Sequence, residues 1–217
     1  MSFQTDGFAI IPGLVSPADC DALIRAVSSG TQTTPGTRTL LAIDAVARVA
    51  ATLRTHPAVS GLMSDRHRVI QCSLFAKGVA SNWSVASHQD LSMPVPERFD
   101  APGWTGWSMK EGGWFVQPPA TVLEQLVAIR LQLDGHAEET GPLEVAPGSH
   151  VLGRLSSAEA GDRAKNRIRC IVPRGGALVM RPLLIHASGK SKSGLDRRVL
   201  HFVYGPPVIP GSGYGTR

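Results

Sequence analysis

Cysteine is scarce in this 217-residue sequence, which contains only Cys20, Cys72 and Cys170 and no CxxC pair. An odd number of widely spaced cysteines argues against a disulfide framework and for reduced thiols in a reducing compartment. The sequence also shows no opening secretory signal and no apolar run long enough to cross a membrane. We therefore expect a soluble, cytoplasmic protein without a membrane partner.

Clustered charge is missing as well. The formal net charge is +5, yet no run of five or six basic residues occurs and aromatic residues do not alternate with them. We therefore expect no nucleic-acid partner, although a modest positive field would favour small anionic substrates. The 23 glycines and 16 prolines indicate a loop-rich β protein and not a helical bundle.

The most informative short motif is His88-Gln89-Asp90. On a β-strand, alternate side chains share a face, so His88 and Asp90 point the same way and Gln89 points away. An imidazole and a carboxylate side by side provide two of the three ligands of the 2-His-1-carboxylate triad that binds non-haem Fe(II). The third ligand should be a histidine on a distant strand, and His186 fits because it follows the apolar residues 176–180 and 183–185.

A cationic residue follows the second histidine at a useful distance. Arg197 comes eleven residues after His186 and opens another apolar strand. The planar guanidinium group binds a carboxylate through two parallel hydrogen bonds. Arg197 is therefore suited to bind a dicarboxylate cosubstrate beside the metal.

The sequence resembles the phytanoyl-CoA dioxygenase-like Fe(II)/2-oxoglutarate oxygenases, in particular the short bacterial members. The resemblance covers nearly the whole chain, to about residue 204, and the Pro147–His150 segment is highly typical of the family. It implies a double-stranded β-helix, also called a jelly roll or cupin-like fold, with Fe(II), 2-oxoglutarate and O2 as cofactor and cosubstrates. The stretches that carry it are Asp6–Gly13, Asn82-Trp83, His88–Asp90, Gly141–His150, His186–Ser188 and Arg197-Arg198.

We expect a mainly β fold with flanking α-helices, forming a single oxygenase domain over residues 1–217. Its helical N-terminal part should span about 14–65 and its barrel about 66–204, with a tryptophan-rich lid inserted at about 91–120. Ser16 and Pro17 predict a helix start. The strands are expected at residues 8–12, 69–75, 126–134, 142–146, 168–172, 176–180 and 197–204.

The resemblance also implies roles in cosubstrate binding. The family spacing from the second histidine selects Arg197 over Arg198, and Ser188 should donate a hydrogen bond beside it. Gln71 matches a cosubstrate-binding glutamine of related ectoine hydroxylases. The alternatives are a turn hydroxyl at Ser188 and a glutamine bonded to barrel backbone at position 71.

All four tryptophans fall within residues 83–114, and Trp83 and Trp107 are candidates to contact substrate. A long irregular insertion with large aromatic residues is uncommon unless it is functional, and Trp is suited to wall a pocket against solvent. We therefore interpret residues 91–120 as an irregular substrate lid. The alternative is that the rings fill a small core beneath the loop.

Three polar residues are further candidates for substrate binding. Arg130 lies in the middle of a predicted strand, where a charged group is costly unless it is paired, so it would hold an anionic group of the substrate. Its alternative is a salt bridge on the outer face. Lys77 and Asn82 would line the mouth of the pocket or be ordinary loop residues. His150 is expected to be structural and not a ligand of iron.

The leading hypothesis is a non-haem Fe(II)/2-oxoglutarate-dependent dioxygenase that hydroxylates an unactivated C–H bond of a small molecule and releases succinate and CO2. The presence of Asp90 favours hydroxylation, because related halogenases lack this carboxylate and place halide there. Desaturation or cyclisation at the same iron centre is an alternative, as is a non-catalytic β-sandwich binding module that retains the motif. We expect a monomer or homodimer.

Overall fold

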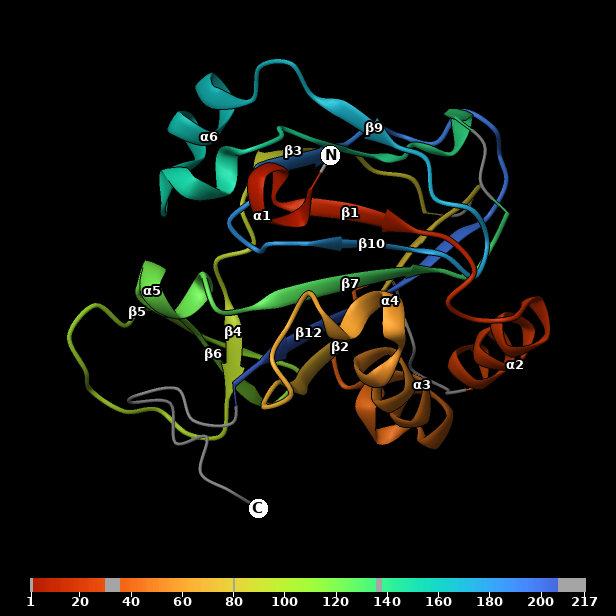
Figure 1. Cartoon of the computed structure of the whole chain (residues 1–217), viewed down its shortest axis with the longest axis horizontal. Coiled ribbons are helices and arrows are strands. Elements are labelled where there is room, and N and C mark those ends of the chain that lie inside the picture. The colour runs from red at the N-terminus through yellow and green to blue at the C-terminus, as the bar shows by residue number, and fades with distance from the viewer. Residues whose placement is uncertain (1, 30–35, 80, 136–137, 207–217) are drawn as a thin grey trace.

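Two antiparallel sheets form the barrel in the computed structural model, which describes residues 2–29, 36–79, 81–135 and 138–206 (Figure 1). The first sheet has the order β1 (Phe8–Ile11), β10 (Ala177–Met180), β7 (Val127–Gln132), β12 (Arg197–Gly205) and β2 (Arg68–Lys77). The second has the order β3 (Val85–His88), β11 (His186–Ser188), β8 (Leu143–Val145) and β9 (Ile168–Cys170).

Side-chain alternation gives the five-stranded sheet two different faces. In β12, Leu200, Phe202 and Tyr204 belong to one large hydrophobic cluster, which also contains residues of the N-terminal helices. A second cluster joins the two sheets, with Ala128 and Leu178 from the first sheet and Leu143 and Val145 from the second among its members. The expected jelly roll with flanking helices is therefore confirmed.

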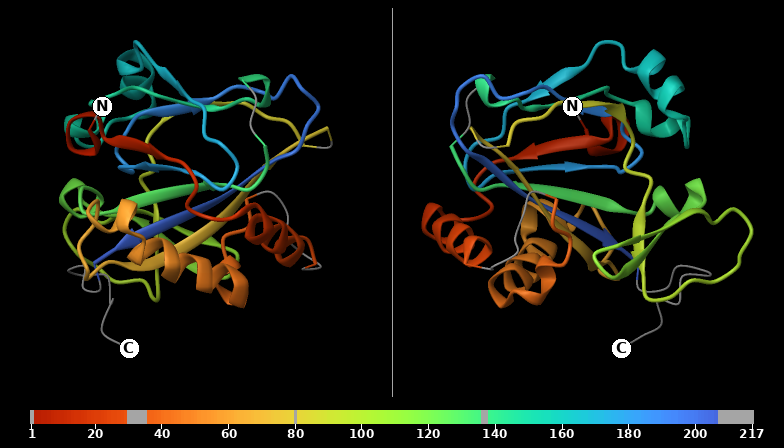
Figure 2. Two further views of the ribbon diagram at one scale, coloured as in Figure 1. Left: turned by 45° about the vertical axis from the view of Figure 1, so that its right-hand side comes forward. Right: turned by 180° about the vertical axis from the view of Figure 1, so that it is seen from behind.

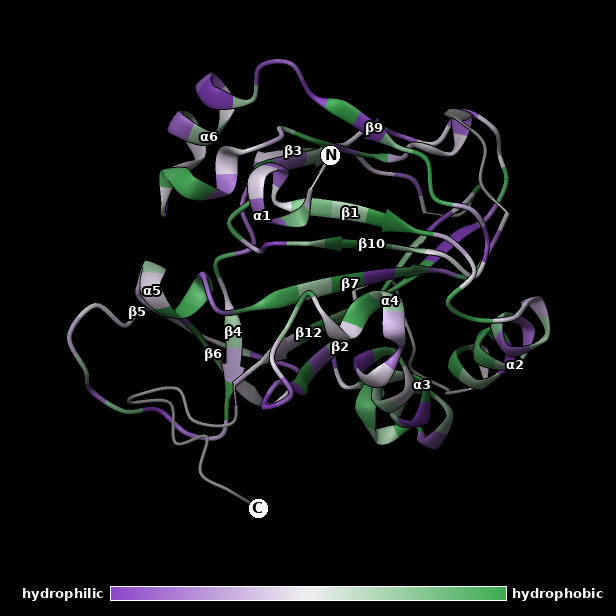
Figure 3. Cartoon of the chain, in the orientation of Figure 1, coloured by the Kyte–Doolittle hydropathy of each residue, from purple (hydrophilic) through white to green (hydrophobic). Residues whose placement is uncertain are grey.

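Helices α2 (Pro17–Ser28), α3 (Asp44–Thr55) and α4 (Pro57–Ser60) lie on the outer side of the five-stranded sheet (Figure 2). Ser16 caps α2 as predicted, because its Oγ accepts a hydrogen bond from the backbone N–H of Asp19 at 3.1 Å. His56 separates α3 from α4, since the proline that follows it disfavours helical backbone at this residue. Both hydrophobic and hydrophilic residues are visible on α2 and α3 in Figure 3, which is the pattern of amphipathic helices.

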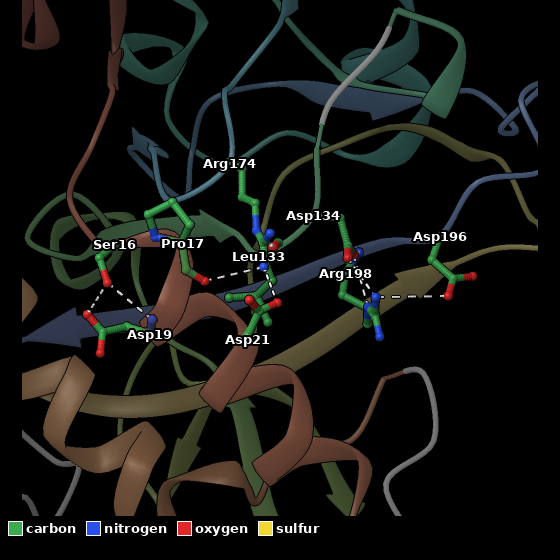
Figure 4. A network of polar contacts seen from close by, with 9 residues as sticks. All are labelled: Ser16, Pro17, Asp19, Asp21, Leu133, Asp134, Arg174, Asp196 and Arg198. Atoms are coloured by element: carbon green, nitrogen blue, oxygen red, sulfur yellow. Dashed lines mark hydrogen bonds and ion pairs between the residues drawn. The ribbon is translucent and has the colours of Figure 1, made fainter.

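A single arginine ties α2 to the barrel (Figure 4). Arg174 lies between β9 and β10, and its Nε donates to the carbonyl oxygen of Leu133 at 2.9 Å. Its Nη2 forms an ion pair with Asp21 and donates to the carbonyl oxygen of Pro17 at 3.4 Å. Arg174 therefore holds the start of α2 against Leu133, the residue that directly follows β7.

The expectation of an irregular loop at residues 91–120 is wrong, because β4 (Met93–Val95), β5 (Thr105–Lys110) and β6 (Gly113–Gln117) form a three-stranded antiparallel sheet. Glu111 and Gly112, both with positive φ, make the two-residue turn between β5 and β6, as the twist of a hairpin requires. The tryptophan- and glycine-rich composition concealed this hairpin.

The remaining helical segments are short. Within the parts of the chain that the structure describes, no helix combines the length and the apolar character needed to cross a bilayer. These segments are α1 (Phe3–Asp6), α5 (Ala120–Leu123), α6 (Ser157–Arg163) and the 3-10 turns Leu40–Ala42, Glu138–Thr140 and Ser149–Leu152.

Candidate metal and cosubstrate site

Two histidines face each other across neighbouring strands. His88 ends β3 and His186 opens β11, and the two residues are register partners with ring centroids 4.2 Å apart. Asp90 follows β3 by two residues, and its backbone N–H donates to the carbonyl oxygen of Pro182 at 2.9 Å. The barrel therefore brings together the His-x-Asp motif and a histidine that is almost 100 residues distant in the sequence.

The carboxylate of Asp90 lies close to both rings. Its Oδ1 is 3.9 Å from Nε2 of His88 and its Oδ2 is 3.7 Å from Nε2 of His186. Within the described residues, Oδ2 is buried and has no hydrogen-bond partner, which is costly for a carboxylate oxygen. The three candidate ligand atoms lie within 4.8 Å of one another. Two nitrogen donors and a carboxylate whose charge has no counter-ion bonded to it among the described residues fit a divalent transition metal.

The backbone orients both imidazoles for this purpose. Nδ1 of His88 is 2.8 Å from the carbonyl oxygen of Ala86, and Nδ1 of His186 is 2.9 Å from that of Leu184. Because a carbonyl only accepts, Nδ1 carries the proton in the neutral form of each ring, and Nε2 then presents its lone pair to the site. These hydrogen bonds prepare both rings as neutral nitrogen ligands.

His186 and Asp90 have the protonation states that metal coordination requires. Burial lowers the pKa of His186 to about 4, so the ring is neutral at pH 7. Burial would raise the pKa of Asp90, but the surrounding imidazoles and the Arg130 guanidinium outweigh it and hold this pKa at about 2. Metal binding at neutral pH thus requires no proton to leave either residue.

Two side chains secure the backbone on either side of the ligands. Gln89 points away from the site, and its amide nitrogen donates to the carbonyl oxygens of Gly153 and Leu183 at 2.8 Å each. Ser149 accepts a hydrogen bond from the N–H of Ile185 at 2.8 Å and donates to the carbonyl oxygen of Ala146 at 2.7 Å. Ser149 therefore fixes the chain next to His186, a role that the sequence did not predict.

A cationic pair lies on the adjoining strands. Arg197 is buried in the pocket, and its Nη1 donates to the carbonyl oxygen of Gly141 at 2.7 Å. Lys77 is its register partner on β2, and the Lys77 Nζ donates to Oγ of Ser188 at 3.0 Å and to the carbonyl oxygen of Gly189 at 2.7 Å. The buried Arg197 Nε has no hydrogen-bond partner within the described chain. Arg197, Lys77 and Ser188 are hereafter called the cationic clamp.

Gly141 shows why the Gly-Pro-Leu motif requires glycine at this position. Its φ is +69°, and a Cβ atom there would lie 2.5 Å from the carbonyl oxygen of Gly189. The two segments therefore approach as backbone against backbone. Because each one provides a carbonyl acceptor to the clamp, this close approach sets the positions of Arg197 and Lys77.

The pocket has an excess of positive charge. The described residues that line it include three cations, Lys77, Arg130 and Arg197, but only one carboxylate, Asp90. Burial, with a further contribution from the neighbouring guanidinium groups, lowers the pKa of Lys77 to about 8. Burial and Arg130 likewise lower the pKa of Arg197 to about 10. An anion bound at the clamp would offset this repulsion.

The arginine after Arg197 lies outside the pocket, as the alternation of a strand predicts. Two nitrogens of Arg198, Nε and Nη2, donate to the carboxylate of Asp134 at 3.0 and 2.6 Å (Figure 4). Asp196 is 4.0 Å from the same guanidinium group. Arg197 and Arg198 thus carry the same charge, but Arg197 lines the pocket and Arg198 is paired with Asp134 outside it.

The candidates for substrate binding fall into two groups. Trp83 and Arg130 line the pocket, and Arg130 does not lie on the outer face. Asn82 is exposed, and its amide bonds the N–H and carbonyl groups of Ser191 at 2.8 Å each. Trp107 packs against Phe99 in a hydrophobic cluster of the small sheet and is not among the residues that line the pocket.

Gln71 lies on the same face of β2 as Ser73, whose hydroxyl accepts a hydrogen bond from its amide nitrogen at 2.8 Å. Its Oε1 is buried without a partner in the described structure, so its predicted cosubstrate role stays a prediction.

Phe75 and His201 also reach the site, although the sequence assigned them no role. The available signal was alternation, because both residues share a face with the clamp residues of their own strands.

Solved structures share this fold at low sequence identity. HygX from Streptomyces hygroscopicus, solved with nickel and 2-oxoglutarate bound, has a TM-score of 0.67 at 19% identity over 95% of this chain and 85% of HygX. SnoN, a non-haem α-ketoglutarate-dependent epimerase from nogalamycin biosynthesis, has a TM-score of 0.67 at 16% identity over 94% of this chain and 78% of its own. SnoK, a carbocyclase from the same biosynthesis, has a TM-score of 0.66 at 14% identity over 98% and 86%.

The family is established at the level of sequence. No curated protein matches the chain. The sequence model of the phytanoyl-CoA dioxygenase family, however, matches residues 3–199 and therefore includes most of the barrel, the His-x-Asp motif and the clamp. The chain thus belongs to the phytanoyl-CoA dioxygenase family and is a 2-oxoglutarate-dependent oxygenase.

Proposed function

We propose that this protein is a non-haem Fe(II)/2-oxoglutarate-dependent dioxygenase that hydroxylates an unactivated C–H bond of a small molecule, with release of succinate and CO2. In this proposal His88, Asp90 and His186 bind Fe(II). Arg197 and Ser188 bind the distal carboxylate of 2-oxoglutarate. In this proposal Lys77, as a member of the clamp, also binds the cosubstrate, whereas the sequence analysis made it a candidate for substrate binding.

One observation carries the proposal. The buried Oδ2 of Asp90 has no hydrogen-bond partner among the described residues, although imidazole nitrogens lie 3.7 and 3.8 Å away. A metal bound to this carboxylate would offset the cost of burying its unpaired negative charge. The cationic clamp opens into the same pocket, so a dianion that contacts both the metal and the clamp would offset charge at each end.

The protein contributes position and charge to the reaction. Bound iron with 2-oxoglutarate and O2 supplies the oxidising chemistry, in which decarboxylation of the cosubstrate is coupled to attack on a C–H bond. His88 and His186 offer neutral nitrogens, and Asp90 offers a negative charge without first losing a proton. The clamp holds the far end of the cosubstrate, and the indole of Trp83 walls the pocket beside it.

Anaerobic titration tests the metal site directly. Fe(II) together with 2-oxoglutarate should produce a visible metal-to-ligand charge-transfer band in the wild-type protein, because the cosubstrate chelates iron held by the triad. The band should be absent in His88→Ala, which loses one ligand. A folded wild-type protein that shows no band would overturn the proposal and favour a non-catalytic binding module.

The type of oxidation is a separate question. SnoK, which has the same fold, is described as a carbocyclase, so cyclisation is an alternative outcome at the same centre, and desaturation is another. Mass spectrometry of the product separates these reactions. Hydroxylation adds one oxygen atom to the substrate, whereas desaturation or oxidative cyclisation removes two hydrogen atoms.

We expect the role of Lys77 to appear in the pH dependence of cosubstrate capture. With a pKa of about 8, the ammonium group is charged below pH 8 and loses its charge as the pH rises through that value. The kcat/KM for 2-oxoglutarate, which reports the free enzyme, should therefore fall between pH 7 and 9. In Lys77→Met it should be lower by ~10-fold at pH 7, the loss of one charge-assisted hydrogen bond.

Lys77→Arg provides the control for this experiment. It keeps the positive charge, so a part of kcat/KM should return, but the guanidinium group does not titrate in this range and the fall above pH 8 should disappear. If the wild type and Lys77→Met have the same pH profile, Lys77 does not bind the cosubstrate.

A further inference from the structure

His201 lies next to Asp90 at the candidate metal site, and the function proposed above gives it no role. It is buried on β12, opposite Arg130 in the register with β7. Its Nδ1 is 3.1 Å from Nη1 of Arg130, and its Nε2 is 3.8 Å from Oδ2 of Asp90. The ring therefore stands between a guanidinium group and the carboxylate that the proposal assigns to the metal.

The contact with Arg130 determines which nitrogen of His201 carries the proton. A guanidinium group only donates hydrogen bonds, so Nδ1 of His201 must accept. The neutral ring then has its proton on Nε2, the nitrogen that faces Asp90. A protonated Nε2 has no lone pair for a metal. His201 is thereby excluded as a fourth ligand and is left as a donor directed at Oδ2.

Arg130 is held in place for this role. Its Cζ lies 5.0 Å from the centre of the Phe75 ring, within the range of a cation–π contact. The guanidinium group is buried on a strand whose residues are buried on both faces of the sheet. Asp90 is the carboxylate whose charge acts on it. Arg130 therefore already has partners within the protein.

We propose that Arg130 and His201 are positioning residues that hold Asp90 as a metal ligand through one oxygen, with the other oxygen accepting the Nε2–H of His201. This inference rests on the proposed function. The present separation of 3.8 Å is about 0.8 Å longer than a typical N–H···O hydrogen bond, and rotation of the carboxylate toward His201 on metal binding closes it. Partners of this kind orient metal ligands and typically change metal affinity ~10–100-fold.

The test measures binding of Fe(II) and, separately, of Co(II) to the full chain under anaerobic conditions, without turnover. We expect His201→Phe to weaken binding ~10–100-fold, because it keeps the ring volume but removes the donor. His201→Gln, which retains an N–H group, should lose less. Arg130→Met should weaken binding ~10-fold because the tautomer is no longer determined, and Arg130→Lys should restore part of the loss.

The double variant Arg130→Met/His201→Phe decides whether the two residues act in series. If Arg130 acts through His201, the double variant should bind metal no more weakly than His201→Phe alone. The matched control is His67→Gln. His67 is also buried, but it bonds the Ser64 hydroxyl and the Gln125 carbonyl oxygen at 2.9 and 2.8 Å, so its loss should leave metal affinity unchanged.

The outcomes separate this inference from the function on which it rests. If the wild type binds neither Fe(II) nor Co(II), the proposed metal site itself fails. If the wild type binds metal and the folded His201 and Arg130 variants bind it equally well, only the positioning role is overturned. The positioning role is also overturned if the variants lower the thermal unfolding temperature of the metal-free protein without changing metal affinity. It is overturned as well if Arg130→Met changes only the KM of the substrate.

Discussion

Replacing Asp90 with alanine is expected to weaken Fe(II) binding by at least ~100-fold in chloride-free buffer and to remove succinate formation. The variant loses the only carboxylate among the described residues that line the pocket, and with it the negative ligand of the triad. The effect should exceed the ~10–100-fold typical of partners that merely support a ligand. Chloride is left out because an added anion is able to occupy the position that the carboxylate vacates.

Asp134→Asn is the matched control for Asp90→Ala. Asp134 is another partly buried carboxylate, but it is bonded to Arg198 (Figure 4) and is not among the residues that line the pocket. We expect this variant to lower the unfolding temperature through the loss of its pairing with Arg198 and to keep the Fe(II) affinity of the wild type. Metal binding by Asp90→Ala at wild-type strength would show that the triad does not hold the metal.

Replacing Arg197 with methionine is expected to raise the KM for 2-oxoglutarate by ~100-fold, with a much smaller effect on the affinity for Fe(II) alone. The buried guanidinium group should make two charge-assisted hydrogen bonds to the distal carboxylate, and losing about 3 kcal/mol of binding corresponds to a factor of ~100. Arg197→Lys should recover little, because an ammonium group does not reproduce the planar fork. Succinate formation at varied 2-oxoglutarate concentration measures this change.

Arg198→Met is the control that the strand itself supplies. It removes the same charge from the next residue, whose side chain bonds Asp134 on the outside of the pocket. The KM for 2-oxoglutarate should stay within about twofold of the wild type. Equal effects of the two substitutions would mean that net charge, and not a specific hydrogen bond, attracts the cosubstrate. Unfolding temperatures of both variants show whether loss of the bond to Gly141 has disturbed the fold.

Much of the fold was accessible from the sequence because it depends on local chemistry. The Ser16 cap and the following proline define the start of α2, and His56-Pro57 divides α3 from α4. The jelly roll was expected from the family resemblance, and the structure confirms it. The hairpin of β5 and β6 was missed because Glu111-Gly112 is a less usual two-residue turn than Asn-Gly or Asp-Gly.

Parity along a strand adds to what the short motifs predict. On β12 it puts Arg197 and Arg198 on opposite faces and His201 on the face of Arg197, and the structure has Arg197 in the pocket and His201 beside Asp90. Parity names a face, however, and does not name a partner. Trp107 and Asn82 were reasonable candidates for the pocket, yet one packs in the cluster of the small sheet and the other bonds the backbone of Ser191.

The sequence by itself determined the family, the β-rich class, the start of α2 and the opposite faces of Arg197 and Arg198, because short motifs and neighbours a few positions apart carry these features. Only the tertiary structure decided that Lys77 meets Ser188 and that His201 stands between Arg130 and Asp90. Those contacts join residues 71 to 111 positions apart. They arise from the register between strands and the packing of one sheet on the other, which no local pattern encodes.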